Sequence, residues 1–199
     1  MARLFGTQLE LPRCPHCGVA APMLMHVAQM TPVTLQGQTR FWRSYACRSC
    51  AGVVSATAPG WDQPVLATFP SAQTFSEDLP SRAREYLIQA FNSMSSPAGA
   101  VMLAASAVDS MLKAKALTAG SLYSRIDEAA AAHLITADMA HWAHDVRLDA
   151  NDQRHADDAA PLPSLDQAKK CVEFAVAFGD FLFVLPARVQ RGIADAGNA

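Results

Sequence analysis

Four of the five cysteines form two Cys-x-x-Cys pairs. The first pair is Cys14 and Cys17, the second is Cys47 and Cys50, and 29 residues separate the pairs. Each pair presents two thiolates to one ion from a tight turn, and two such turns complete a tetrahedral sulfur site. The spacing therefore predicts one structural Zn²⁺ per chain. A closed shell of four thiolates leaves no open position for a catalytic water.

Basic and aromatic residues interleave shortly before and within the second pair. The run contains Arg40, Phe41, Trp42, Arg43, Tyr45 and Arg48. Arginines can contact phosphates while aromatic rings stack on bases, so this run is a candidate nucleic-acid-binding site. The residues assigned to that site are Arg40, Trp42, Arg43 and Arg48. The alternative is that the rings form the small core of this module and the arginines are solvated. The alternative is favoured because so small a module needs its aromatic rings to form a buried core.

A second group of chemically capable residues recurs along one helical face. At 100° per residue, His144, Arg147, Asn151 and His155 fall within an arc of about 60°. Such a set could cleave RNA without a metal: a histidine would move the proton of the 2′-hydroxyl, and an arginine would hold the scissile phosphate. The same residues could instead form a buried polar network with neighbouring helices. Spacing alone favours this structural alternative.

The formal net charge of −2 is unevenly distributed. Residues 1–60 carry five basic groups and one acidic group, a net of +4, whereas residues 61–199 carry eleven basic and seventeen acidic groups, a net of −6. A single strongly basic nucleic-acid footprint over the whole chain is therefore excluded. A local footprint on the N-terminal part is still possible by charge.

Composition indicates a globular protein, with 51% hydrophobic and 17% charged residues. Residues 1–10 lack the apolar core of a signal peptide. The most apolar run, 171–187, contains Glu173 and Asp180, so it is expected to be a buried helix rather than a membrane span. The paired cysteines point to a reducing compartment. We expect a cytoplasmic protein with no membrane partner.

The chain divides into three stretches by pattern. Residues 1–58 alternate β-prone runs with turn residues, with strands predicted over 23–30, 41–45 and 53–56 and a hairpin turn at 36–38. Residues 59–76 are proline-rich and predicted as a linker. Residues 77–199 are predicted to be helical, with helices over 80–94, 97–117, 122–134 and 136–156, and a fifth from 164 to at least 185. The second and fifth of these helices are apolar on most of their surface. Either they form the centre of a bundle or one face meets a second subunit, and a dimer is expected.

The helical stretch resembles a known family of bacterial proteins. The segments that carry the resemblance are 84–86, 97–101, 109–112, 121–127, 134–136 and 143–147, with Asn151 and His155. Together they are similar to the family called domain of unknown function 4145, whose members often carry a zinc ribbon in front. That family is similar to the wider HEPN group of helical domains, often dimeric, many of which are ribonucleases using an arginine and a histidine on one helix. The resemblance implies Arg147, Asn151 and His155 as the functional set. His144 is a further candidate by its place on the same helical face.

The sequence therefore predicts a mostly α chain: a five-helix HEPN-like bundle preceded by a small β zinc ribbon. The expected domains are a zinc ribbon over 1–58, a linker over 59–76 and a helical bundle over 77–199. The first functional expectation is a nucleic-acid-associated protein that forms a homodimer through the helical domain and is non-catalytic or weakly catalytic. The alternative is a metal-independent endoribonuclease that uses Arg147 and His155, as the resemblance suggests, in defence against foreign genetic elements. RNA and DNA are both candidate ligands.

Overall fold

The computed structural model describes residues 5–71, 73–155 and 161–197, without the side chains of residues 148–149 and 152–155. The chain separates into two compact units, Met1–Gln73 and Thr74–Ala199. Each unit has its own core and is treated by itself below.

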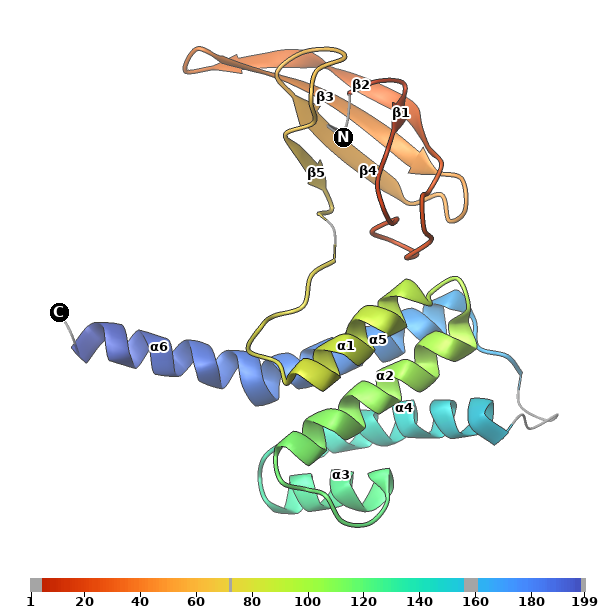
Figure 1. Cartoon of the computed structure of the whole chain (residues 1–199), viewed down its shortest axis with the longest axis vertical. Coiled ribbons are helices and arrows are strands. Elements are labelled where there is room, and N and C mark those ends of the chain that lie inside the picture. Colours follow the sequence, from red (N-terminus) through yellow and green to blue (C-terminus); the bar gives the residue numbers. More distant parts are fainter. Residues whose placement is uncertain (1–4, 72, 156–160, 198–199) are drawn as a thin grey trace. The chain divides into compact units, whose positions relative to one another are not determined.

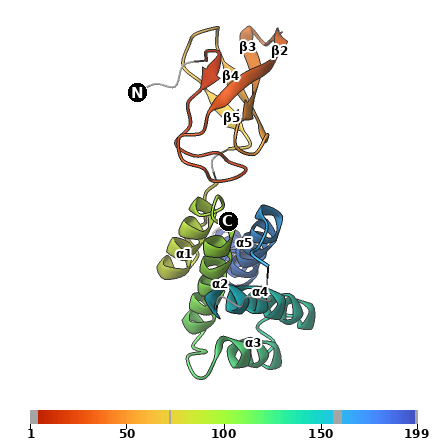
Figure 2. The same cartoon turned by 90° about the vertical axis from the view of Figure 1, so that its right-hand side faces the viewer.

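The first unit is an antiparallel sheet in the order β1-β2-β3-β4-β5, which curls on itself (Figures 1 and 2). Its strands are β1 (Gln8–Leu9), β2 (Leu24–Leu35), β3 (Gln38–Cys47), β4 (Val53–Ala58) and β5 (Ala67–Phe69). Gln36 and Gly37 join β2 to β3 with φ values of 50° and 74°. A two-residue hairpin turn needs this left-handed geometry. The hairpin predicted at this point is confirmed.

One face of this sheet carries the small core of the first unit. Phe5, Leu9, Leu24, Tyr45 and Val54 are fully buried there. The Tyr45 hydroxyl donates to the carbonyl of Gly6 at 2.8 Å, which fastens the N-terminal segment over the sheet. β1 pairs only with the first two residues of β2. The outer part of the β2–β3 hairpin is therefore exposed.

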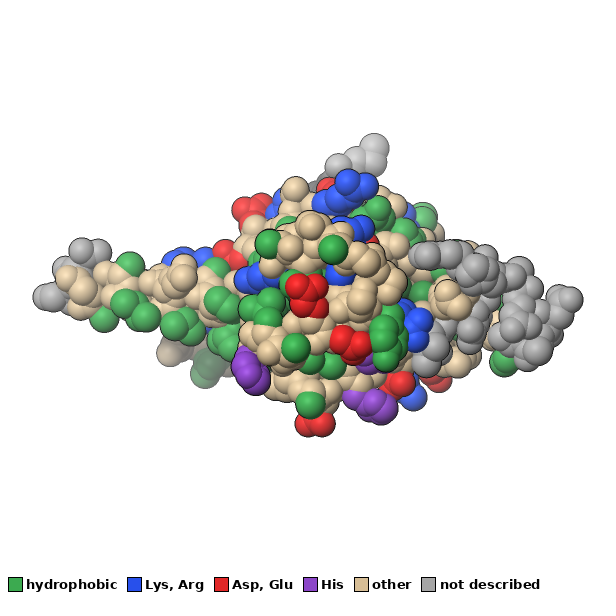
Figure 3. All heavy atoms as spheres, turned by 90° about the horizontal axis from the view of Figure 1, so that it is seen from below, with side chains coloured by type: hydrophobic (Ala, Val, Ile, Leu, Met, Phe, Trp, Pro, Cys, Tyr) green, Lys and Arg blue, Asp and Glu red, His purple; other side chains and the backbone are tan. Residues whose placement is uncertain are grey.

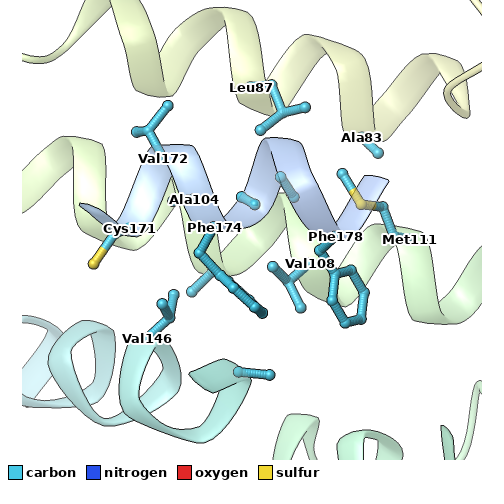
Figure 4. Close-up of a cluster of buried hydrophobic side chains, with 14 of the residues drawn as sticks. Ala83, Leu87, Ala104, Val108, Met111, Val146, Cys171, Val172, Phe174 and Phe178 are labelled. Atoms are coloured by element: carbon cyan, nitrogen blue, oxygen red, sulfur yellow. The ribbon is translucent and has the colours of Figure 1, made fainter. Parts of the chain in front are cut away.

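The second unit is helical. Its elements are α1 (Ser81–Asn92), α2 (Pro97–Ala114), α3 (Leu122–Ala131), α4 (Ala137–His155), α5 (Leu165–Gly179), a π-helical segment (Asp180–Val184) and α6 (Leu185–Gly197). α2 lies at the centre and contacts α1, α3, α4 and α5 (Figure 2). Small Ala104 on α2 lets α5 approach closely, and Val108 packs near Phe174 and Phe178 (Figure 4). Cys171 is buried in the same core.

Helix boundaries follow local sequence signals. Ser164 and Gln167 form a capping box at the start of α5, as their spacing predicts. Ser121 and Ser124 form a second capping box at the start of α3. Pro97 occupies the first turn of α2, where its missing N–H is not needed.

α6 differs from the other helices because none of its residues is buried. Leu185, Val189 and Ile193 recur every fourth residue and are each at least half exposed. They continue a stripe that starts at Phe181 in the π-helical segment. Figure 3 shows hydrophobic side chains along this projecting helix. Among the described helices, none combines the length and the apolar character that crossing a membrane requires.

The predicted fold class, a mostly α chain with a five-helix HEPN-like bundle and a small β ribbon, is wrong. The chain is 48% helix and 20% strand, which makes it mixed α/β. β2 and β3 run to 12 and 10 residues, well beyond the strands predicted over 23–30 and 41–45. β5 lies inside residues 59–76, predicted as linker. The last predicted helix, from 164 to at least 185, comprises α5 and the π-helical segment and continues into α6.

Candidate metal centre and nucleic-acid interface

The four paired cysteines lie together in the first unit. Their Sγ atoms are all within 4.8 Å of one another. Those of Cys14 and Cys50, one from each pair, are 3.9 Å apart. Four sulfurs at about 2.3 Å from one tetrahedral ion lie about 3.8 Å from each other. The cluster is therefore close to the size that one tetrahedral metal ion requires.

Two loops of matching geometry carry the cysteines. In the first loop Gly18 donates its N–H to the carbonyl of Cys14 at 2.9 Å, and in the second Ala51 donates to Cys47 at 2.8 Å. Gly18 and Ala51 have φ values of 68° and 58° and so occupy the same left-handed position of their loops. The first loop uses glycine there, whereas the second holds an alanine in a conformation that costs it free energy.

Backbone amides also point at the sulfurs. His16 donates its N–H to Cys14 Sγ at 3.5 Å, and Gly52 donates to Cys50 Sγ at 3.4 Å. Hydrogen bonds to sulfur stabilise the charged thiolate form. A glycine follows each cysteine pair, but positive φ occurs at Gly18 and Ala51, so Gly52 is needed for another reason.

That reason is the His16 ring. A Cβ on Gly52 would lie 2.5 Å from the ring carbons of His16. The ring is held there because His16 Nε2 lies 2.8 Å from the carbonyl oxygen of Val53. His16 is therefore a brace between the two cysteine loops, and its ring is not in the group of four sulfurs.

Burial is the main cause of the raised pKa of two of the thiols. It raises the pKa of Cys17 to about 12 and also raises the pKa of Cys14. Burial acts the same way on Cys47, but the backbone N–H groups of Ser49 and Cys50 outweigh it and lower the pKa of that thiol. A metal ion would displace the thiol protons and pair the buried charges. Four soft sulfur donors in a tetrahedral arrangement suit Zn²⁺.

The basic and aromatic run on β3 divides between the two faces of the sheet. Arg43 lies on the core face, where its guanidinium stacks 4.4 Å from the Trp61 ring centre and 5.3 Å from that of Phe5. Its Nη1 donates to the Phe5 carbonyl at 2.8 Å. Arg43 is thus a structural residue that fastens two loops to the sheet. Phe41 lies on the same face, 4.7 Å from Trp61.

Arg40 and Trp42 share the opposite face. The Trp42 ring centre lies 5.7 Å from that of Phe69 on β5. In the strand register, Trp42 on β3 is paired with Met30 on β2. We call this surface, formed by Met30, Arg40, Trp42 and Phe69, the Trp42 face. Met30 and Phe69 are more than half exposed. No sequence signal pointed to Phe69, because its segment lacks strand periodicity.

Arg48, the last of the four candidate nucleic-acid-binding residues, lies in the second cysteine loop. Its side chain is exposed. Its backbone N–H donates to the carbonyl of Met23 at 3.0 Å, which joins the loop to the segment before β2. The exposed Arg48 side chain is accessible to a ligand, but it does not belong to the Trp42 face.

On α4 the structure brings His144 and Arg147 together around a residue of α3. The ring of Tyr123 lies 4.6 Å from the His144 ring, and the Arg147 guanidinium lies 5.2 Å from the Tyr123 ring centre. His144 Nε2 is 2.9 Å from Asp127 Oδ1. Tyr123 and Asp127 were not identified as site residues from the sequence, because residues that meet across two helices leave no spacing signal.

The inward-facing atoms of this cluster limit its chemistry. His144 Nδ1 and Arg147 Nε are buried and have no hydrogen-bond partner in the described part of the chain. Both ring nitrogens of His144 are thus engaged or enclosed, since Nε2 contacts Asp127 and Nδ1 is buried. Asn151 is exposed on the same helix. The side chain of His155 lies outside the described residues.

Comparison with known proteins gives one match. The family model described as "Domain of unknown function (DUF4145)" matches residues 87–195, which is more than half of the chain and runs from α1 into α6. No curated protein and no solved structure matches the chain. The chain belongs to the DUF4145 family.

Proposed function

We propose that this protein is a zinc-stabilised, nucleic-acid-associated protein whose Trp42 face contacts single-stranded RNA or DNA. The observation that carries the proposal is the pairing of Trp42 with Phe69 on a face that leaves Phe69 and Met30 largely exposed. Exposed rings beside a cation are a platform on which bases stack while the backbone phosphates meet the charge. Arg40 supplies that cation on the same face.

The distribution of charge also supports nucleic-acid binding by the first unit. The first 60 residues carry five arginines and one glutamate, whereas the rest of the chain is acidic. Phosphate contacts supply most of the sequence-independent affinity for nucleic acid. The first unit is therefore the part of the chain suited to a polyanion.

The zinc has a structural role in this proposal. Cys14, Cys17, Cys47 and Cys50 would hold it. Bound there, it would fix the two cysteine loops and through them the ends of β3 and β4. Since four sulfurs close the coordination shell, the ion would not supply a reactive water.

The helical unit is proposed to form a homodimer through α6. A groove of about 500 Å³ opens beside the root of this helix and is lined mainly by apolar residues, among them Leu134, Leu182 and Leu185. The apolar stripe of α6 continues outward from the same groove. One chain thus carries both the groove and the apolar stripe of α6. Two copies related by a two-fold axis could therefore cover each other's stripe.

The alternative function is a metal-independent endoribonuclease that uses Arg147 and His155. The observation in its favour is that Asp127 holds the His144 ring, close to Arg147, as a carboxylate orients a catalytic imidazole. The non-catalytic function is preferred because Nδ1 of His144 is buried and Asp127 already engages Nε2. Asn151 would be a phosphate contact in the alternative.

The test of the main proposal is binding of a fluorescently labelled single-stranded RNA, measured by anisotropy over a range of salt concentrations. Trp42→Ala should weaken binding about tenfold or more, because one base–ring stack contributes about 1–3 kcal/mol. Arg40→Gln should weaken binding and lower the salt slope by about one. Trp42→Phe should retain most of the affinity. The control is Arg188→Gln, which makes the same charge change on exposed α6 and should leave binding unchanged.

Two results would contradict the proposal: no binding at low salt, or equal binding by wild type and Trp42→Ala. The alternative is tested on the same RNA without divalent ions. Cleavage that is lost in His155→Ala and kept in His133→Ala would establish the nuclease. Absence of cleavage by wild type would exclude it.

A further inference from the structure

A pocket of about 740 Å³ lies in the second unit between α1, α2 and α3. Its walls come from the first turns of α1, the C-terminal half of α2 and the first turn of α3. The residues that line it include Arg82, Tyr86, Asp109, Lys113 and Arg125. Neither His144 nor Arg147 lines this pocket. The proposed function makes no use of it.

The floor of the pocket is a charged network. Arg125 is buried, with only 6% of the residue and 8% of its side chain exposed. Its Nε and Nη2 donate to Asp109 Oδ1, and its Nη1 donates to the carbonyl of Gly120 at 2.5 Å. Lys113 Nζ contacts the other oxygen of Asp109 at 2.6 Å. Two cations therefore share one carboxylate, and the network has an excess of positive charge.

The rim adds to that excess. Arg82 is exposed at the start of α1, and no ion pair in the described part of the chain involves it. The lining thus holds three cations and one anion, in a region of the chain, residues 61–199, whose net charge is −6. A concave, net-positive site in an otherwise acidic unit concentrates anions.

Hydrogen-bond donors are available in the same pocket. The first turn of α1 has no side-chain cap and no acidic residue, so its backbone N–H groups beside Ser81 and Arg82 are unsatisfied by the helix. The hydroxyls of Ser81, Ser110 and Tyr86 also line the pocket, and no hydrogen bond within the described residues uses them. Cations, hydroxyls and helical N–H groups together are the donors that a phosphoryl group accepts from.

The remaining wall is less polar. The ring of Tyr86 and the side chain of Leu122 line the pocket with Pro80 and Ala105. The volume lies within the range of small-molecule sites, far above what a lone phosphate needs. A ligand with an apolar or aromatic body beside its phosphoryl group would use both parts of the lining.

We propose that the pocket between α1, α2 and α3 binds a small organic phosphate, with the phosphoryl group between Arg82 and Lys113 and the body against Tyr86. Arg125 and Asp109 build the floor and position Lys113. The site is independent of the nucleic-acid contact proposed for the first unit, so either can fail without the other.

The test is calorimetric titration of the full chain with phenyl phosphate, inorganic phosphate and phenol. Phenyl phosphate should bind with a Kd below about 1 mM, inorganic phosphate more weakly, and phenol not at all. The double variant Arg82→Gln/Lys113→Gln should weaken phenyl phosphate binding about tenfold or more, since it removes two charge-assisted contacts. Lys170→Gln/Arg188→Gln makes the same charge change away from the pocket and should bind as wild type.

Backbone amide shifts of wild-type protein on addition of phenyl phosphate give a second readout that needs no variant. Shifts should concentrate at Ser81, Ser110 and Tyr86. The proposal is overturned if phenyl phosphate produces no heat and no shifts. It is equally overturned if both double variants bind alike, or if the shifts fall outside the pocket.

Discussion

The Sγ atoms of Cys14 and Cys50 lie 3.9 Å apart, although the two residues are separated by 36 positions and belong to different loops. Thiols this close without a disulfide are placed by the loops around them. Each loop closes on itself through a backbone hydrogen bond, and His16 braces one loop against the other through the carbonyl of Val53. The site is therefore formed by the fold of the first unit as well as by the cysteines.

Removing one thiol should unfold the first unit and spare the second. Cys47→Ser is expected to lose bound metal, because three thiolates and a hydroxyl bind it far more weakly, and metal binding contributes directly to folding. Limited proteolysis should then cleave within residues 5–71, while the helical circular dichroism signal is kept. The control is Cys171→Ala, a buried cysteine of the helical core. It should keep the metal and lower helical stability by about 1–2 kcal/mol. A protease-resistant first unit in Cys47→Ser would contradict the prediction.

Gly52→Ala should destabilise the first unit by about 1–3 kcal/mol, since the new methyl group would overlap the His16 ring. His16→Ala in the same chain should recover part of that loss, because it removes the ring that is struck. Chemical denaturation followed by tryptophan fluorescence measures both changes. Gly192→Ala is the matched substitution, as a Cβ there meets no atom within 4 Å. Additive losses in the double variant would show that the ring is not the obstacle.

Arg125→Ala should destabilise the second unit by about 3–5 kcal/mol, because it leaves Asp109 partly buried without its main partner. Arg125→Lys should recover only part of this, since one ammonium cannot reach both the carboxylate and the Gly120 carbonyl. Thermal unfolding followed at 222 nm reports the change. Arg188→Ala, on exposed α6, serves as the control. A loss below 1 kcal/mol for Arg125→Ala would mean that the network does not hold α2 to α3.

Val189→Asp should abolish self-association, because it places a charge in the middle of the apolar stripe of α6. Ala194→Asp adds the same charge to the opposite side of this helix and should leave the dimer intact. Analytical ultracentrifugation at several concentrations measures the oligomeric state. A wild-type protein that stays monomeric throughout would exclude α6 as a dimer contact, and so would a dimer that both variants retain.

Local signals predicted much of the backbone. The two Cys-x-x-Cys pairs, the turn at Gln36 and Gly37, and the capping box at Ser164 are each encoded within a few residues. Such features need no knowledge of distant contacts, so the sequence was sufficient for them.

Features that depend on pairing over longer distances were missed. β5 lies in a proline-rich segment and is a strand only because β4 is beside it. For the last helix, the sequence predicted a start at residue 164 and an extent to at least residue 185, and it did not give the further length that forms α6. Pro186 lies in the first turn of α6, after the π-helical segment, where a proline is tolerated.

The candidate sites were also predicted to different extents, because some depend on local spacing and others on contacts between distant segments. The cysteines were found because their spacing is itself the signal. On β3, the alternation of faces separates Arg43 from Arg40, but only the structure shows that Phe5 and Trp61 cover Arg43. Tyr123 and Asp127 meet His144 from another helix and could not be assigned to it by spacing.

The most direct test of the structural zinc site is the metal content of the purified chain, measured by elemental mass spectrometry beside its protein concentration. The account predicts one zinc per chain in wild type and in Cys171→Ala, and a small fraction of that in Cys14→Ser and Cys50→Ser. Wild-type protein that is folded by circular dichroism and protease resistance, but holds neither zinc nor another metal, would contradict it.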